Sequence, residues 1–171
     1  GYSGALPQIL AGCGMQGFAT QKITWAYNGG DPFPYNTFWW EGIDGTAVPA
    51  HIFTDYNAEM RPNSVLDRWN TRLKKTGIST MIMSFGWGDG GGGPTRDHLE
   101  FYRRVQDLEG LPRVKMSSPA EFFADLRALG LGFQHMGPKK AVQALRLLGE
   151  PRVVVPTHYS GQTLRPLLYF R

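Results

Sequence analysis

The chain of 171 residues has little of several features that define special classes of protein. It has one cysteine, Cys13, which excludes an internal disulfide framework and a cysteine-rich zinc site. It has no run of about 18 apolar residues, so no segment is predicted to span a membrane. Charged residues make up only 19% and hydrophobic residues 42%, so disorder is not expected. This length and composition predict about one folded domain.

Acidic charge is nearly missing from the end of the chain. Residues 128–171 contain six lysines and arginines but one acid, Glu150, whereas residues 1–127 contain 12 basic and 13 acidic residues. The larger region therefore gives no electrostatic reason to expect nucleic acid as a partner. The basic residues of the tail are scattered and lack interleaved aromatics, which favours a solvated surface over a nucleic-acid site. We expect the region 1–127 and the tail 128–171 to differ in character.

Strands and helices are predicted along the chain, and they alternate from residue 62 onward. The expected helices cover 3–12, 65–75, 95–107, 118–129 and 138–148, and the expected strands cover 18–20, 38–40, 47–53, 79–85, 114–116 and 152–155. This alternation predicts an α/β protein with parallel strands, either a doubly wound sheet or a fragment of a β/α barrel. In both, ligands bind beyond the carboxyl ends of the strands, where Asp55 and Asp89 would lie.

The strongest local feature is a glycine-rich loop around one acid. Asp89 is followed by four consecutive glycines, Gly90 to Gly93, which leave the backbone free to let a ligand approach closely. A phosphate-binding loop does not fit, because the run lacks the Lys-Ser/Thr pair that grips phosphate and because Asp89 would repel it. Two interpretations stay open: a flexible loop with a solvated acid, and a loop that presents a carboxylate to a ligand.

Two other segments carry aromatic and polar side chains. Trp39 and Trp40 precede Glu41 on a predicted strand, where neighbours face opposite sides, so at least one ring is expected at a surface or cleft. Aromatic walls beside carboxylates suit sugars, and the alternative is that each ring closes a core. His51 and Asp55, four residues apart at a strand end, are either a metal pair or polar groups that are satisfied locally.

Several stretches, taken in order, resemble the catalytic domain of glycoside hydrolase family 38, the class II α-mannosidases, and are most similar to its cytosolic and bacterial branch. These stretches are Gly1–Ser3, Leu6–Leu10, Thr20–Trp25, Phe33–Tyr35, Thr37–Gly45, Gly86–Thr95, Gly110–Val114 and Ser117–Pro119. The resemblance covers about residues 1–127 and implies a fragment of the family's N-terminal β/α barrel. It also implies a cytoplasmic, zinc-dependent enzyme that hydrolyses terminal α-mannosyl residues of mannose-containing glycans with retention.

The resemblance also implies roles for the residues singled out above. Asp89 matches the family's general acid/base, Asp55 and Tyr56 match a region near the bound sugar, and Trp39–Glu41 matches a segment that borders the active site. The family's nucleophile is the aspartate of an Asp-x-Phe-Gly-Tyr-Ser motif and would precede Gly1, while the family's zinc ligands have no match in this sequence. Both ends of the chain read as cuts through a folded region. The chain alone is therefore expected to be inactive and to bind no zinc.

The tail departs from this family. Residues 133–160 resemble the end of a metallo-β-lactamase-type hydrolase, in which a Met-Gly-Pro helix precedes a strand ending in Pro-x-His-Tyr and that histidine binds metal. His158 matches this position, so a metal-dependent hydrolase is one alternative, and an unmetallated strand-end histidine is the other interpretation of this residue. A third hypothesis is a non-catalytic sugar-binding or inert fragment, because an opened barrel leaves strand edges unpaired. The sequence predicts no oligomeric state.

Overall fold

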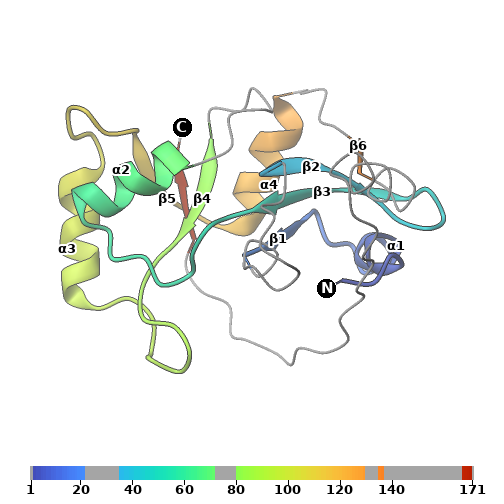
Figure 1. The fold of residues 1–171 in the computed structure, drawn as a ribbon, viewed down its shortest axis with the longest axis horizontal. Helices are drawn as coiled ribbons and strands as arrows, with labels where there is room; N and C mark the ends of the chain where they lie inside the picture. Colours follow the sequence, from blue (N-terminus) through green and yellow to red (C-terminus); the bar gives the residue numbers. More distant parts are fainter. Residues whose placement is uncertain (1, 22–34, 72–79, 130–134, 137–166, 171) are drawn as a thin grey trace, which may run out of the picture.

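The computed structural model describes residues 2–21, 35–71, 80–129, 135–136 and 167–170 (Figure 1). The helices in these ranges are α1 (Leu6–Gly12), α2 (Pro62–Thr71), α3 (Arg96–Val105) and α4 (Pro119–Ala128). The strands are β1 (Phe18–Thr20), β2 (Thr37–Glu41), β3 (Ala47–Ile52), β4 (Met81–Ser84), β5 (Val114–Ser117), β6 (His135–Met136) and β7 (Leu167–Phe170).

The first sheet has the strand order β1-β3-β2-β6. β1 and β3 are parallel, with Thr20 opposite Ile52, whereas β2 and β3 are antiparallel, with Trp39 opposite Pro49. The antiparallel pair follows from the short turn over residues 42–46, since only antiparallel strands can be joined by a tight hairpin. β6 adds a parallel pairing of two residues to the free edge of β2.

The second sheet has the order β4-β7-β5. β7 runs antiparallel to both neighbours, and Leu168 lies opposite Met83 on one side and Met116 on the other. The apolar end of the chain therefore completes a sheet whose other strands come from the region before residue 128.

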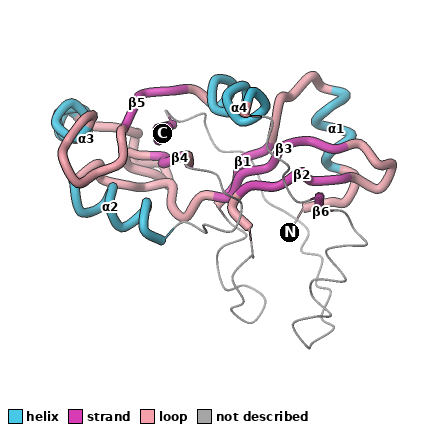
Figure 2. The backbone as a smooth tube through the Cα atoms, turned by 90° about the horizontal axis from the view of Figure 1, so that it is seen from above, coloured by secondary structure: helices cyan, strands magenta, loops and turns pink. Residues whose placement is uncertain are grey.

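Three hydrophobic clusters hold the helices against the sheets. α2 and α3 lie at the end of the molecule that carries β4 and β5, and α4 lies over β1 and β3 (Figures 1 and 2). The first cluster joins α2 and α3 to β4 and is built from Ala58, Met60, Val65, Met81, Met83, Phe85, Val105 and Val114. The second joins α4 to β4 through Ile82, Phe122, Phe123 and Leu126, and Ala19 of β1 and Trp39 of β2 pack against it. The third covers the opposite face of the first sheet with Phe38, Ala50 and Ile52.

Reciprocal N-terminal caps fix the starts of α3 and α4. Ser118 accepts from the backbone N–H of Glu121 at 3.2 Å, and the Glu121 carboxylate accepts from the Ser118 N–H at 3.0 Å. The hydroxyl of Ser117 and the Ser118 N–H lower the pKa of Glu121. In α3 the same arrangement pairs Thr95 with His98, a histidine where Glu or Gln is usual.

The structure confirms the α/β class and most of the expected elements, but the expectation of parallel strands is wrong for three pairs. Among the described strands, β2–β3, β4–β7 and β5–β7 are antiparallel. The expected helix at 138–148 and strand at 152–155 lie outside the described residues. The β/α barrel stays a prediction. No helix within the described ranges is long and apolar enough to cross a membrane.

Candidate active site

The glycine-rich segment after β4 forms a β-hairpin. Trp87 and Gly93 exchange two backbone hydrogen bonds of 2.9 Å, and the Gly91 N–H donates to the Gly88 carbonyl at 2.7 Å. Asp89 and Gly90 occupy the two central turn positions with φ angles of +49° and +87°, as a type I′ turn requires. Asp-Gly is a favoured pair for this turn, because both residues tolerate positive φ. The segment is thus a defined turn with Asp89 exposed at its tip, and presentation of this carboxylate to a ligand stays a prediction.

Gly86 sets the base of this hairpin. Its φ is +103°, and a Cβ atom built there would lie 2.5 Å from the Pro94 nitrogen and 2.6 Å from the Gly93 carbonyl carbon. These contacts are with backbone atoms, so no side-chain rotation relieves them. The hairpin can fold back on β4 only because residue 86 has no side chain.

Tyr56 brings the segment after β3 to the Asp89 turn. The Tyr56 hydroxyl donates to both carboxylate oxygens of Asp89, with an oxygen–oxygen distance of 3.2 Å to each. A parallel bridge between Ala58 and Phe85 joins the same two segments through their backbones. Two residues that the sequence singled out separately, 33 positions apart, therefore lie in contact.

The Asp55 carboxylate is held by structural partners. Its Oδ2 pairs with the Arg68 guanidinium of α2 at 2.5 Å, and its Oδ1 accepts from the Asn57 N–H at 2.9 Å. These contacts fix the turn that carries Tyr56. A polar pocket of about 320 Å³ lies beside the pair, between this turn and the start of α2. Contact of Asp55 with a sugar stays a prediction.

His51 is buried between the two sheets and is fully hydrogen-bonded. Its Nδ1 lies 2.8 Å from the Thr37 hydroxyl, and its Nε2 accepts from the Ile82 N–H at 3.2 Å. Because Nε2 accepts, the neutral ring carries its proton on Nδ1 and donates it to Thr37. Burial lowers the pKa of His51 to about 3, so the ring is neutral at pH 7. Of the two interpretations of His51 and Asp55, the structure shows the locally satisfied one.

Sequence reasoning missed His98. Its side chain is 96% buried at the start of α3, and its Nδ1 accepts from the Thr95 N–H at 3.2 Å. Its ring packs nearly perpendicular to Trp87, with 5.3 Å between ring centroids. Within the described part of the chain, Nε2 has no hydrogen-bond partner. The available signal was the histidine three residues after a Thr N-cap, next to the acid-bearing loop.

The aromatic segment of β2 faces both sides of the first sheet. Trp39 packs on the α4 cluster, and Trp40 packs on the opposite face, with its ring 5.2 Å from that of Phe18 and 6.1 Å from that of Tyr2. Both rings are half-buried, as is Glu41 at the end of the strand. The alternation predicted for neighbours on a strand is confirmed, while a sugar-binding role for these three residues stays a prediction.

The described residues do not fit a zinc site. No group of three or more His, Cys, Asp or Glu side chains that could hold a metal occurs in the described ranges. Both ring nitrogens of His51 and one of His98 already have partners. His158, the candidate for a metal ligand in the tail, lies outside the described residues, as does most of the segment 133–160.

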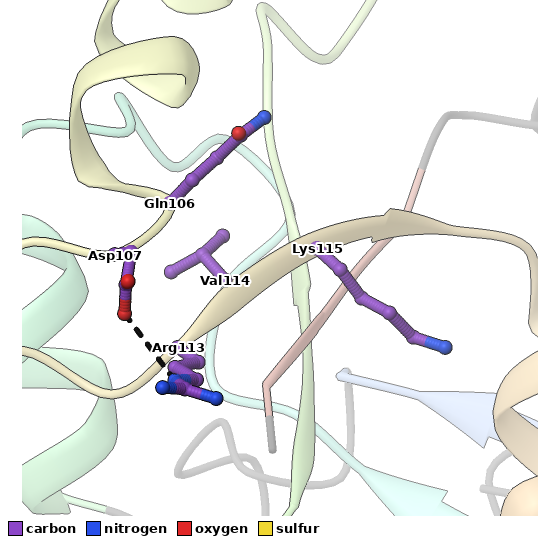
Figure 3. Close-up of a pocket in the computed structure, with 5 residues that line it drawn as sticks. All are labelled: Gln106, Asp107, Arg113, Val114 and Lys115. Atoms are coloured by element: carbon purple, nitrogen blue, oxygen red, sulfur yellow. Dashed lines mark ion pairs between the residues drawn. The ribbon is translucent and has the colours of Figure 1, made fainter.

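A second pocket lies at the end of α3 and the start of β5. It measures about 380 Å³ and is lined by Gln106, Asp107, Arg113, Val114 and Lys115 (Figure 3). The Asp107–Arg113 ion pair across it spans 3.2 Å, and both side chains are 80% exposed. A depression bounded by an exposed ion pair has little capacity to desolvate a ligand, and none of the predicted site residues lines it.

Comparison with known proteins identifies the class as a glycoside hydrolase. Residues 1–138 match the family described as the glycosyl hydrolases family 38 N-terminal domain, and the chain belongs to this family. Human "Alpha-mannosidase 2C1" is 41% identical over 130 residues, which are 75% of this chain and 12% of that protein. "Alpha-mannosidase G" of Dictyostelium discoideum is 36% identical over 128 residues, and the Saccharomyces cerevisiae "Alpha-mannosidase" is 32% identical over 132 residues. These matches cover 74% and 73% of this chain, and 12% of each relative. The chain therefore spans about an eighth of the length of the curated relatives it matches.

Proposed function

We propose that the chain forms the acid/base part of the catalytic domain of a retaining exo-α-mannosidase, which hydrolyses terminal α-mannosyl residues of mannose-containing glycans. Family membership and the names of the relatives support the reaction class. The observation that carries the proposal is the contact of Tyr56 with Asp89, because it holds an exposed carboxylate at a defined place on the turn. A flexible, solvated acid would have no such partner.

Asp89 has two tasks in this proposal. As an acid it protonates the glycosidic oxygen when the bond to the leaving group breaks, and as a base it then takes a proton from the water that releases the sugar. The Tyr56 hydroxyl contacts both carboxylate oxygens, so it can hold the group in place in both steps. Precise placement of this kind is a large part of enzymatic rate enhancement.

Retention requires a second carboxylate about 5–5.5 Å from the first, which acts as the nucleophile. By the resemblance, this aspartate would stand three residues before Gly1, and the geometry near residue 2 supports such a position. The Tyr2 hydroxyl contacts the Thr20 side chain at the carboxyl end of β1. The Thr20 backbone carbonyl accepts from the Phe53 N–H at 3.0 Å, and Phe53 precedes Tyr56 by three residues. Residue 2 thus lies at the same edge of the sheet as the segment that holds Asp89.

The described residues give no step in which zinc takes part. Their His, Cys, Asp and Glu side chains do not assemble a metal site, so a zinc requirement of the whole enzyme would depend on ligands elsewhere. We accordingly propose that the 171-residue chain alone turns over no aryl α-mannoside. A fragment that only binds sugar is the alternative.

The test uses a hybrid enzyme, in which the matching segment of about 130 residues in the human relative is replaced by that of this chain. Two substrates are compared: an α-linked mannobiose, whose leaving sugar needs a proton, and α-mannosyl fluoride, whose leaving fluoride does not. Asp89→Asn should lower kcat/KM for mannobiose by about 10²–10⁴-fold and leave kcat/KM for the fluoride largely unchanged. Glu109→Gln, at an exposed acid after α3, is the control and should change neither value. Equal losses on both substrates in Asp89→Asn would contradict an acid role.

A further inference from the structure

The Asp89 hairpin carries a large exposed aromatic side chain. Trp87 is 45% exposed and lies two residues before Asp89. Phe85, two residues before Trp87, is completely buried. Gly86, with φ of +103°, lies between them. The chain therefore passes from the core at Phe85 to the surface at Trp87, and then to the acid in the turn.

His98 fills the space between these two aromatic residues. Its ring centroid lies 6.4 Å from that of Phe85 and 5.3 Å from that of Trp87, the latter at an interplanar angle of 87°. Its Nδ1 is fixed by Thr95, whose N–H lies at 3.2 Å and whose hydroxyl lies at 2.8 Å. Aromatic rings favour this edge-to-face contact. His98 is therefore a buried support against which the Trp87 ring is held.

The backbone of the hairpin restrains Trp87 as well. Its N–H and carbonyl both bond to Gly93, and a Cβ atom at Gly91 would lie only 2.8 Å from the Trp87 Cβ. The missing side chain at residue 91 lets the turn close tightly beside the indole. A ring that is already ordered loses little entropy when a ligand binds to it, so it is well suited to binding.

We propose that Trp87 is the contact surface for the leaving-group sugar, with His98 as the residue that positions its ring. This inference rests on the proposed function, since it takes Asp89 as the acid. The acid approaches the oxygen that joins the two sugars, on the side of the leaving group. A flat apolar ring on the same hairpin, two residues before the acid, is therefore placed to cover an apolar C–H face of that second sugar. The exposed indole has both the area and the polar N–H typical of side chains that bind amphipathic ligands.

Trp87 then determines specificity for the leaving group that is linked to the terminal mannose. Substrates with a sugar as leaving group gain from the stacking contact, and substrates without one do not. An interaction of this kind contributes about tenfold to kcat/KM, the factor typical of one aromatic contact.

The test measures kcat/KM of the hybrid enzyme for α-linked mannobiose and for α-mannosyl fluoride. Trp87→Ala should lower the value for mannobiose about tenfold and leave that for the fluoride within about twofold. Trp87→Phe, which keeps a smaller ring and guards against misfolding, should lose about threefold on mannobiose. Leu99→Ala is the matched control, because Leu99 on α3 is 44% exposed and Trp87 is 45% exposed. It should affect neither substrate.

His98→Gln isolates the positioning role. Glutamine keeps an acceptor for the Thr95 N–H, as in an ordinary capping box, but removes the ring under Trp87. The expected result is a rise of about threefold in KM for mannobiose, with unchanged kcat and unchanged kinetics on the fluoride. A merely structural His98 would lower both activities together.

The outcomes separate the two proposals. If Trp87→Ala and Trp87→Phe lower kcat/KM equally for both substrates, or for neither, the contact surface is refuted while Asp89 keeps its role. If the unsubstituted hybrid turns over neither substrate, the proposed function fails and this inference fails with it. Selective loss on mannobiose in both Trp87 variants establishes the leaving-group contact.

Discussion

Two buried histidines mark two regions of the molecule that differ in their use of polar groups. His51 lies between β3 and β4 with both ring nitrogens hydrogen-bonded, and the residues around it are buried. His98 lies under the Asp89 hairpin with one ring nitrogen bonded and its ring against the exposed Trp87. The first region joins the two sheets, and the second supports side chains that face solvent.

The difference shows how burial alone fails to separate scaffold from site. Both histidines are at least 96% buried. What separates them is the completeness of their hydrogen bonding and the exposure of the residues they contact. We therefore expect changes at His51 to affect mainly the stability of the fold, and changes around His98 to affect mainly substrate selection.

The largest effect is expected for His51→Ala. It leaves the Ile82 N–H without its acceptor and opens a cavity beside Phe122, whose ring centroid lies 4.8 Å from that of His51. The free energy of unfolding should fall by about 4 kcal/mol, and by about half of that for His98→Ala, which loses one bonded ring nitrogen. Urea denaturation of the chain measures both, and equal losses would erase the distinction between the regions.

The second prediction concerns pH. The pKa of His51 is about 3 in the folded chain and 6.5 in its ordinary state, so the unfolded chain binds more protons between these values. The contribution of His51 is complete above pH 6.5 and is lost as pH falls toward 3. Stability should drop by about 2.5 kcal/mol from pH 6 to pH 4 through this group. Urea denaturation across this range should show the drop in the unchanged chain and its removal in His51→Ala, and parallel curves would contradict it.

Gly86→Ala tests the base of the hairpin. The new Cβ would meet the Pro94 and Gly93 backbone at 2.5–2.6 Å in a backbone with φ of +103°. Gly90→Ala is the matched control, because φ is +87° but nothing lies within 4 Å. We expect Gly86→Ala to cost about 2 kcal/mol more than the control in thermal or urea unfolding. Equal costs would mean that positive φ alone, and not the close approach, requires glycine at residue 86.

The smallest effect is expected for Tyr56→Phe. It removes the hydroxyl that contacts Asp89 and keeps the ring. The hybrid enzyme should lose about tenfold in kcat for mannobiose, about the value of one hydrogen bond to a charged group, without loss of stability. A change in stability with unchanged kcat would show that Tyr56 stabilises the fold and does not assist Asp89.

Local features of the sequence predicted local structure well. The helices at 96–105 and 119–128 begin one residue after the expected starts, because Thr95 and Ser118 are their N-caps. The Asp-Gly pair at 89–90 fits the observed turn for the same reason, since turn chemistry depends on adjacent residues.

Features that depend on distant segments could not be predicted in this way. The Asp55–Arg68 ion pair depends on how α2 packs against the segment after β3. β7 enters the second sheet from the far end of the chain, and no periodicity of β4 or β5 indicates such a partner. The hairpin β2–β3 is different, because the Asp44-Gly45 pair between the two expected strands is typical of a tight turn and could have indicated an antiparallel pair.

The proposed role of Asp89 is that of the acid/base in a retaining hydrolysis. Its most direct test is to trap the sugar released by the Asp89→Ala hybrid with azide, using α-mannosyl fluoride as substrate. Without a base at residue 89, water attacks the sugar–enzyme intermediate slowly, whereas azide needs no base and approaches from the face that water would use. We expect faster turnover with azide and α-mannosyl azide as the product, with the configuration of the substrate. A β-mannosyl azide, or no acceleration by azide, would contradict it.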